Sequence, residues 1–182
     1  MSETRRNIEL KARLRHRATA HEAAESLADR PVEVQSQCDT YFHCRHGRLK
    51  LREIDGRGAQ LIWYDRADLA DAKPSNYRLA DVADGESLKA TLAAALGVRA
   101  VVRKNRRVYW HRNVRIHLDE VDSLGSFLEF EAVIADSADS AEDAAARQLV
   151  AELLTHFDLR PDDLLRRSYG DMLAAADGDC GA

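Results

Sequence analysis

The sequence contains few cysteines, few prolines and few aromatic residues. Among its 182 residues are three cysteines and three prolines, and aromatic side chains make up 6%. An odd number of cysteines does not support a paired disulfide framework, which favours a reducing compartment and a cytoplasmic protein. The small number of prolines does not indicate a long linker, and 45% apolar residues are enough for one core. We therefore expect one domain over residues 1–173 and a flexible tail over residues 174–182.

The sequence also lacks long apolar runs and an excess of positive charge. No apolar stretch approaches the roughly 20 residues of a membrane-spanning helix, so we expect no membrane partner. The chain has 27 Lys and Arg against 31 Asp and Glu. Because nucleic-acid-binding domains usually carry a basic surplus, nucleic acid is not an expected partner. Residues 103–112 mix cations with aromatics, but a strand there would place only Lys104 and Arg106 on one face.

Several familiar catalytic and metal-binding motifs are also missing. The chain has no glycine-rich phosphate loop, and no Ser or Cys lies in a recognisable nucleophile context, so covalent catalysis is not expected. Cys38, His43, Cys44 and His46 lie close together, but their spacing matches no closed zinc motif.

Alternation of apolar and charged residues predicts a strand over residues 7–15. Similar patterns and turn residues predict seven more strands, over residues 32–42, 48–54, 61–66, 76–82, 98–107, 113–121 and 126–134. Apolar spacing and capping residues predict helices over residues 20–29, 84–96, 140–157 and 161–173, and polar composition predicts loops over residues 67–75 and 136–139. This order lacks the βαβ alternation of a parallel sheet, so we expect an antiparallel α+β fold.

Charged residues recur on one face of several predicted strands, opposite apolar residues on the other face. The sets, one for each of four strands, are Glu9/Lys11, Lys50/Arg52, Arg115/His117/Asp119 and Glu129/Glu131. If the faces meet inside a closed sheet, carboxylates and cations together suit a metal-bound polyphosphate. The alternative is a solvated sheet face with cross-strand ion pairs. Glu129 and Glu131 are the best metal candidates, because like charges two residues apart repel unless a cation lies between them.

Taken in order, these segments resemble the CYTH superfamily, whose members include class IV adenylyl cyclases, thiamine triphosphatase and inorganic triphosphatases. The segments that carry the resemblance are Asn7-Ile8-Glu9-Leu10-Lys11, Gln37 to Phe42, Leu49 to Glu53, Val102 to Arg106, Ile116 to Val121, Leu124 to Glu131, and Ser168-Tyr169. The resemblance implies an antiparallel barrel of eight strands that encloses a triphosphate tunnel, with helices packed around it.

The resemblance also implies a set of site residues. It assigns Mg²⁺ or Mn²⁺ binding to Glu9, Asp119, Glu129 and Glu131, triphosphate binding to Lys11, Lys50, Arg52, Arg66, Lys104, Arg106 and Arg115, and catalytic roles to Glu9, Lys11 and Arg52. The implied substrate is ATP, inorganic triphosphate or thiamine triphosphate. In a cyclase the 3′-hydroxyl of the nucleotide would attack the α-phosphorus, and in a triphosphatase water would attack the terminal phosphorus. A binding module without catalysis is the alternative, and a homodimer is compatible with the sequence.

Asn7 departs from the signature that it otherwise resembles. It stands where the E-x-E-x-K pattern has its first Glu. An amide oxygen can ligate a hard cation but contributes no negative charge. We therefore expect weaker metal binding than a complete signature would give.

Overall fold

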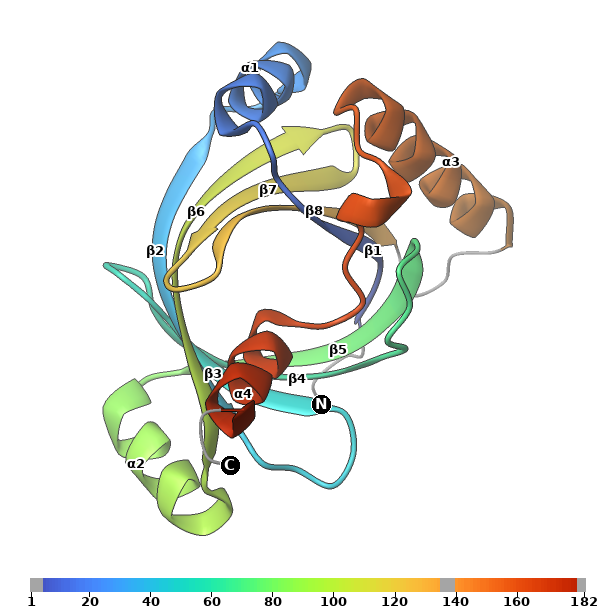
Figure 1. The fold of residues 1–182 in the computed structure, drawn as a ribbon. Coiled ribbons are helices and arrows are strands. Elements are labelled where there is room, and N and C mark those ends of the chain that lie inside the picture. Colours follow the sequence, from blue (N-terminus) through green and yellow to red (C-terminus); the bar gives the residue numbers. More distant parts are fainter. Residues whose placement is uncertain (1–4, 135–139, 180–182) are drawn as a thin grey trace.

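The computed structural model describes residues 5–134 and 140–179. Eight antiparallel strands form a closed barrel with four helices around it (Figure 1). The strands are β1 (Arg5–Arg13), β2 (Glu33–Phe42), β3 (Arg48–Ile54), β4 (Gly58–Arg66), β5 (Lys73–Val82), β6 (Val98–His111), β7 (Val114–Val121) and β8 (Gly125–Ile134). The helices are α1 (Arg17–Leu27), α2 (Gly85–Leu96), α3 (Ser140–His156) and α4 (Tyr169–Asp179). The predicted α+β fold and its eight-stranded antiparallel barrel are confirmed.

Neighbouring strands follow the order β1-β5-β4-β3-β2-β6-β7-β8, and β8 pairs again with β1 to close the barrel. Strands β6 to β8 are connected by hairpins, and β8, the last of the three, pairs with the N-terminal strand β1. The registers of these ladders decide which inward-facing side chains become neighbours. Glu9 lies opposite Glu131, Lys11 opposite Glu129, and Arg115 opposite Glu131 on its other side.

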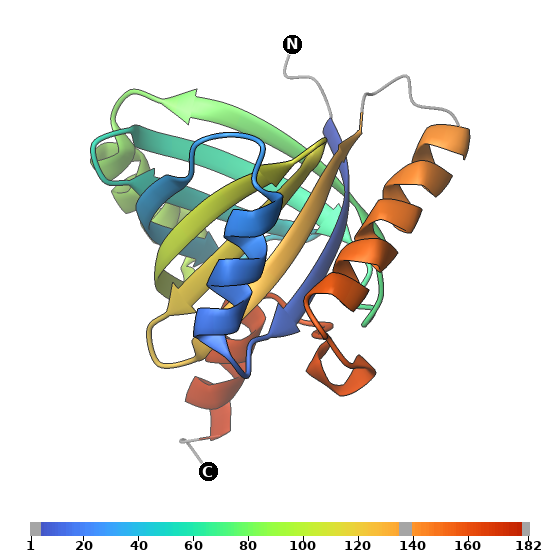
Figure 2. The same ribbon diagram turned by 90° about the horizontal axis from the view of Figure 1, so that it is seen from above.

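The apolar side chains of the alternating strands face outward, where helices cover them. Ile8 and Leu10 of β1 and Phe130 of β8 belong to a buried cluster that also contains Val150 and Leu153 of α3. Helix α1 packs over β6 and β7, α3 over β8 and β1, and α2 over β2, β3 and β4. Figure 2 shows α1 and α3 lying along the outside of the barrel. Because the helices bury the apolar faces, the charged faces point into the barrel, which contradicts the solvated-face alternative.

The C-terminal segment differs from its prediction. Pro161 begins a 3-10 turn over Pro161–Asp163 rather than a helix. After it, Leu164 bridges to Ala12, and the backbone N–H of Leu165 donates to the carbonyl of Lys11 at 2.8 Å. Helix α4 begins only at Tyr169, and it includes residues 174–179 of the segment predicted as a tail. Figure 2 shows α4 at one end of the barrel.

Other boundaries shift by a few residues. Helix α1 begins at Arg17, three residues before its prediction, and β5 begins at Lys73, inside the predicted loop. Strand β6 continues to His111, four residues past its prediction. The predicted loop at 136–139 lies outside the described residues. Within the described part of the chain, no helix has the length and apolarity needed to cross a membrane.

Candidate functional site

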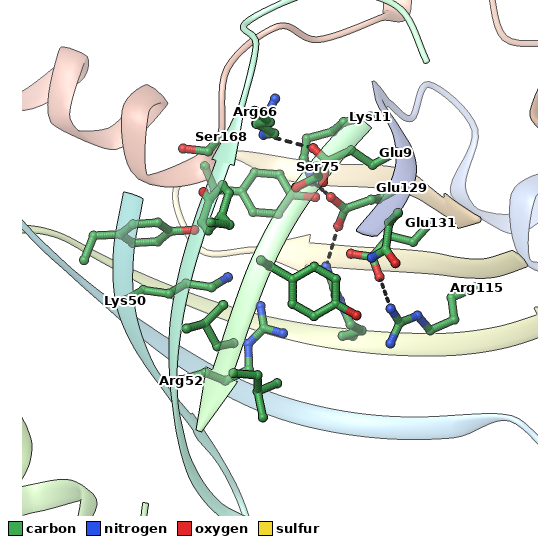
Figure 3. Close-up of a pocket in the computed structure, with 18 of the residues that line it drawn as sticks. Glu9, Lys11, Lys50, Arg52, Arg66, Ser75, Arg115, Glu129, Glu131 and Ser168 are labelled. Carbon is green, nitrogen blue, oxygen red and sulfur yellow. Dashed lines mark hydrogen bonds and ion pairs between the residues drawn. The ribbon is translucent and has the colours of Figure 1, made fainter. Parts of the chain in front are cut away.

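A cavity of about 130 Å³ lies inside the barrel and is lined mainly by polar side chains (Figure 3). Seven cationic side chains line it: Lys11, Lys50, Arg52, Arg66, Lys104, Arg106 and Arg115. Three carboxylates line it as well: Glu9, Glu129 and Glu131. Neutral lining comes from Asn7, Ser75, Ser168, Ile62, Leu79 and the tyrosines Tyr41, Tyr64, Tyr77 and Tyr169. The excess of cations over carboxylates makes the cavity suited to an anion.

The structure brings together ten of the eleven residues predicted for the site. Asp119 is the exception, because it lies behind Arg106 and does not line the cavity. Its two oxygens accept hydrogen bonds from Arg106 Nε and Nη2, each at 2.6 Å, and the Tyr169 hydroxyl donates to it at 2.9 Å. Although burial acts to raise the pKa of Asp119, Arg106 and Lys104 lower it below its usual value. These contacts give Asp119 the geometry of a group that holds Arg106 in place.

The three lining carboxylates form one group on β1 and β8, and each pairs with a cation. Arg66 Nε lies 2.9 Å from Glu9, Lys11 Nζ lies 3.0 Å from Glu129, and Arg115 Nη2 lies 3.0 Å from Glu131. Figure 3 shows Glu9, Glu129 and Glu131 close together, apart from Lys50 and Arg52.

Glu9 is electrostatically the least satisfied of these carboxylates. Burial and the charge of Glu129 raise its pKa, although Arg66 opposes the shift. For Glu129, burial acts in the same direction, but Lys11 and a hydrogen bond from His117 hold its pKa well below the usual value. A cation between the carboxylates would relieve the repulsion that Glu9 experiences.

His117 was not predicted as a site residue, although it shares the charged face of β7. Its side chain is buried, with Nδ1 3.5 Å from Glu129 and Nε2 3.9 Å from Glu131. Potential ligand atoms of these three residues all lie within 4.8 Å of one another. Burial and Arg106 lower the pKa of His117, which favours the neutral imidazole.

Asp39 is a second residue that sequence reasoning missed, and it organises the cations away from the carboxylate group. It lies 2.8 Å from Lys50, accepts hydrogen bonds from Arg52 at 2.8 and 2.9 Å, and lies 3.7 Å from Lys104. Burial acts to raise its pKa, but Arg52, Lys50 and Lys104 together hold it well below the usual value. Asp39 shares the inner face of β2 with other buried residues, but a single carboxylate on a strand is a weak signal in the sequence.

Tyrosine rings hold the lysines in position. Lys11 Nζ lies 3.8 Å from the centre of the Tyr169 ring and Lys104 Nζ 5.2 Å from it. Lys50 Nζ lies 5.4 Å from the Tyr41 ring centre and 5.7 Å from that of Tyr64. Such cation–π contacts keep the ammonium groups inside the barrel while leaving them able to donate hydrogen bonds.

The residues present fit a hard divalent cation. Clustered carboxylate oxygens and a nearby amide oxygen are the donors that Mg²⁺ and Mn²⁺ take. The buried Asn7 Oδ1 has no hydrogen-bond partner within the described residues, so its lone pairs remain available to a cation. Asn7 lies opposite Ser75 and two residues from Glu9 on the same face of β1.

Comparisons with known proteins agree with this geometry. The family model of the CYTH domain matches residues 5–169. A Methanocaldococcus jannaschii protein named "Putative adenylate cyclase MJ0240" is 24% identical over 170 residues, which cover 89% of this chain and 95% of that protein.

Two solved structures show the same fold at low sequence identity. The PH1012 protein of Pyrococcus horikoshii is 22% identical with a TM-score of 0.77, over 91% of this chain and 98% of that one. HpAC1 of Hippeastrum, described as a "Putative adenylyl cyclase" with a dominant triphosphatase activity, is 14% identical with a TM-score of 0.63, over 94% and 96% of the two chains.

Proposed function

Because the chain belongs to the CYTH domain family, we propose that it is a metal-dependent enzyme that acts on a triphosphate inside its barrel. The observation that carries the proposal is the arrangement of charge in the cavity. A compact carboxylate group, Glu9, Glu129 and Glu131, shares the cavity with seven buried or half-buried cations. A polyanion bound together with a divalent cation complements both sets of charges.

The metal would be held by Glu9, Glu129 and Glu131, with the Asn7 amide oxygen beside them. When bound, Mg²⁺ or Mn²⁺ supplies positive charge that offsets the charge developing on phosphate oxygens. We propose that His117 holds Glu129 and Glu131 in position through its two ring nitrogens, which lie 3.5 Å and 3.9 Å from the two carboxylates. Asp119, expected from the resemblance as a further metal ligand, is instead proposed to position Arg106, because Arg106 and Tyr169 already occupy its oxygens.

The cations would bind and orient the phosphate chain. Lys50, Arg52 and Lys104 converge on Asp39, and these ion pairs hold their side chains in place. Fixed donors lose little conformational entropy when they bind phosphate and need no reorganisation as charge develops. Lys11 and Arg66, now paired with Glu129 and Glu9, would exchange these carboxylates for phosphate oxygens. Lys11 and Arg52 are the proposed catalytic cations, with Glu9 as the catalytic carboxylate.

Two reactions fit this site, because both need only positioning and charge stabilisation around an in-line attack. In the cyclase reaction the nucleotide's own 3′-hydroxyl attacks the α-phosphorus and pyrophosphate leaves. In the triphosphatase reaction water attacks the terminal phosphorus, the bond from that phosphorus to the bridging oxygen breaks, the diphosphate part of the substrate leaves, and orthophosphate is formed. The names of the M. jannaschii and Hippeastrum proteins give support to both. A binding module that does not turn over is the third outcome, and Asn7 is the reason to test it.

Phosphorus NMR of the purified protein with ATP, thiamine triphosphate or tripolyphosphate and Mg²⁺ or Mn²⁺ separates these outcomes. Cyclic AMP with pyrophosphate identifies a cyclase, and orthophosphate identifies a triphosphatase. Tight binding by calorimetry without any product would refute the enzyme and leave the binding module.

Two variants test the assignments within the site. We expect Glu131→Ala to abolish metal dependence and Arg52→Ala to weaken triphosphate binding by roughly tenfold or more, the scale of a lost charge-assisted hydrogen bond. Arg103→Ala serves as the control, because Arg103 is exposed on the outer face of β6 beside the inner-face Lys104. If Glu131→Ala and Arg52→Ala both destabilise the fold, but the remaining folded molecules bind metal and triphosphate as the wild type does, the assigned binding roles are refuted. The two residues would then form structural ion pairs.

A further inference from the structure

One wall of the cavity differs from the rest in its chemistry. Strands β4 and β5 contribute Ile62, Tyr64, Tyr77 and Leu79 to the lining. We call these four residues the β4–β5 wall. The other lining residues from these two strands are Ser75 and the cation Arg66 at the end of β4. The acidic lining residues come from β1 and β8, so neither strand of this wall contributes a carboxylate to the cavity.

The four side chains of the β4–β5 wall form a continuous patch. In the ladder between the two strands, Ile62 lies opposite Leu79 and Tyr64 opposite Tyr77. Directly opposed side chains in an antiparallel pair are about 5 Å apart, and residues two apart share a face. Ile62 is buried, whereas Tyr64, Tyr77 and Leu79 keep part of their surface exposed. Apolar surface is therefore available to a molecule in the cavity.

The wall adjoins the cations proposed to bind phosphate. Lys50 lies opposite Ile62 in the β3–β4 ladder, and its ammonium group lies 5.7 Å from the Tyr64 ring centre. A phosphate chain held by Lys50 and Arg52 would therefore have one end next to the wall. A group that follows the phosphates at that end would lie beside the β4–β5 wall.

Phosphate itself is a poor occupant of this wall. A charged oxygen placed against Ile62 and Leu79 loses hydration and gains no hydrogen-bond donor. A flat heteroaromatic ring, in contrast, buries apolar area against Ile62 and Leu79 and can stack on Tyr77. Inorganic tripolyphosphate, which is charged along its whole length, has no such group to offer.

We propose that the β4–β5 wall is the subsite for the flat heteroaromatic group of an organic triphosphate, and that it selects such substrates over inorganic tripolyphosphate. The inference rests on the proposed function, because the phosphates must be held by the cations of the cavity. Both a nucleobase and the rings of thiamine provide the required chemistry. The two sources are separate arms of the test.

The test measures binding of ATP, thiamine triphosphate and tripolyphosphate by calorimetry at one free Mg²⁺ concentration. We expect Tyr77→Ala to weaken the organic ligand roughly 5- to 100-fold, the range for a lost ring-stacking contact. Leu79→Ser should also weaken it, because the change removes apolar area that the ring would bury. Both variants should leave tripolyphosphate within about twofold. Tyr77→Phe keeps the ring and should retain affinity. The arm that loses more, ATP or thiamine triphosphate, identifies the ring that the wall accepts.

Arg78→Ala is the matched control, because Arg78 follows Tyr77 on the exposed outer face of β5. Two results would overturn the proposed subsite. One is that Tyr77→Ala weakens tripolyphosphate as much as it weakens the organic ligands. The other is that neither Tyr77→Ala nor Leu79→Ser weakens ATP or thiamine triphosphate. The Arg52→Ala variant separates the two proposals. If it weakens all three ligands while the wall variants change none, only the subsite fails. If none of the three binds the wild-type protein, the proposed function fails as well.

Discussion

Lys104 is the cation whose charge we expect to set the pH dependence of triphosphate binding. Its side chain is almost completely buried, and burial together with Arg106 lowers its pKa to about 7, although Asp119 and Asp39 each lie 3.7 Å away and oppose the shift. A lysine with this pKa is largely charged at pH 6 and about nine-tenths neutral at pH 8. A bound polyanion favours the charged form, so binding at pH 8 must draw a proton from solution.

The magnitude follows from the shift of the proton equilibrium. If the triphosphate keeps Lys104 charged throughout, the dissociation constant should rise about tenfold between pH 6 and pH 8. Calorimetry in two buffers with different ionisation enthalpies should detect uptake of close to one proton per ligand at pH 8. Lys50, whose burial and proximity to Arg52 lower its pKa to about 8, should add to this Lys104 contribution about half a proton at pH 8 and about a further twofold rise in the dissociation constant.

Lys104→Arg provides the comparison, because arginine stays charged at both pH values. The ionisation of the triphosphate is the same for both proteins, so the difference between them isolates Lys104. We expect the variant to take up about one proton fewer at pH 8 and to lose the tenfold dependence. Equal proton uptake by the wild-type and the variant protein would refute the reasoning.

Three further predictions concern other residues of the cavity. Asn7→Glu should tighten Mn²⁺ binding in calorimetry because it adds a charge to the carboxylate group; unchanged or weaker affinity in a folded variant would contradict this. Asp39→Asn should lower the free energy of unfolding in urea at pH 7 by about 3–5 kcal/mol, since Lys50 and Arg52 lose a buried counter-ion. Because the pKa of Asp39 is lowered in the folded protein, its contribution to the free energy of unfolding is fully present above about pH 4 and is lost as the pH falls further. A stability difference between wild type and Asp39→Asn that stays undiminished far below pH 4 would contradict the ion pairing of Asp39 with Lys50 and Arg52. Tyr169→Phe removes the hydrogen bond to Asp119 and should cost about 1–2 kcal/mol in the same assay, whereas equal stability would show that the bond contributes nothing.

The inner face of the barrel was predictable because alternation is a local property of the chain. Glu9 and Lys11 on β1, and Glu129 and Glu131 on β8, follow from the period of two, and all four line one cavity. The role of Asp39 was not predictable in this way. Its contact with Arg52 depends on the register between β2 and β3, which the alternation does not specify.

The C-terminal segment shows how a tertiary contact overrides a local signal. Pro161 suits the first turn of a helix, and a 3-10 turn does begin there. The helix does not continue, because Leu164 and Leu165 use backbone groups to pair with Ala12 and Lys11 of β1. That pairing sets the chain on the path that brings Tyr169 over Lys11, a contact between residues far apart in sequence.

The pairing of β1 with β5 and β8 links assembly of the site to folding of the whole chain. Among the described residues, β1 is the first strand in sequence order and its neighbour β8 is the last. Glu9 and Glu131 become neighbours only when β1 pairs with β8. Pairing between strands so far apart in sequence forms slowly, because closing the loop between them costs conformational entropy before any contact is gained. A divalent cation that binds both carboxylates would link β1 to β8. It should therefore protect the β1–β8 pairing from local unfolding more than it protects the β6–β7 and β7–β8 hairpins.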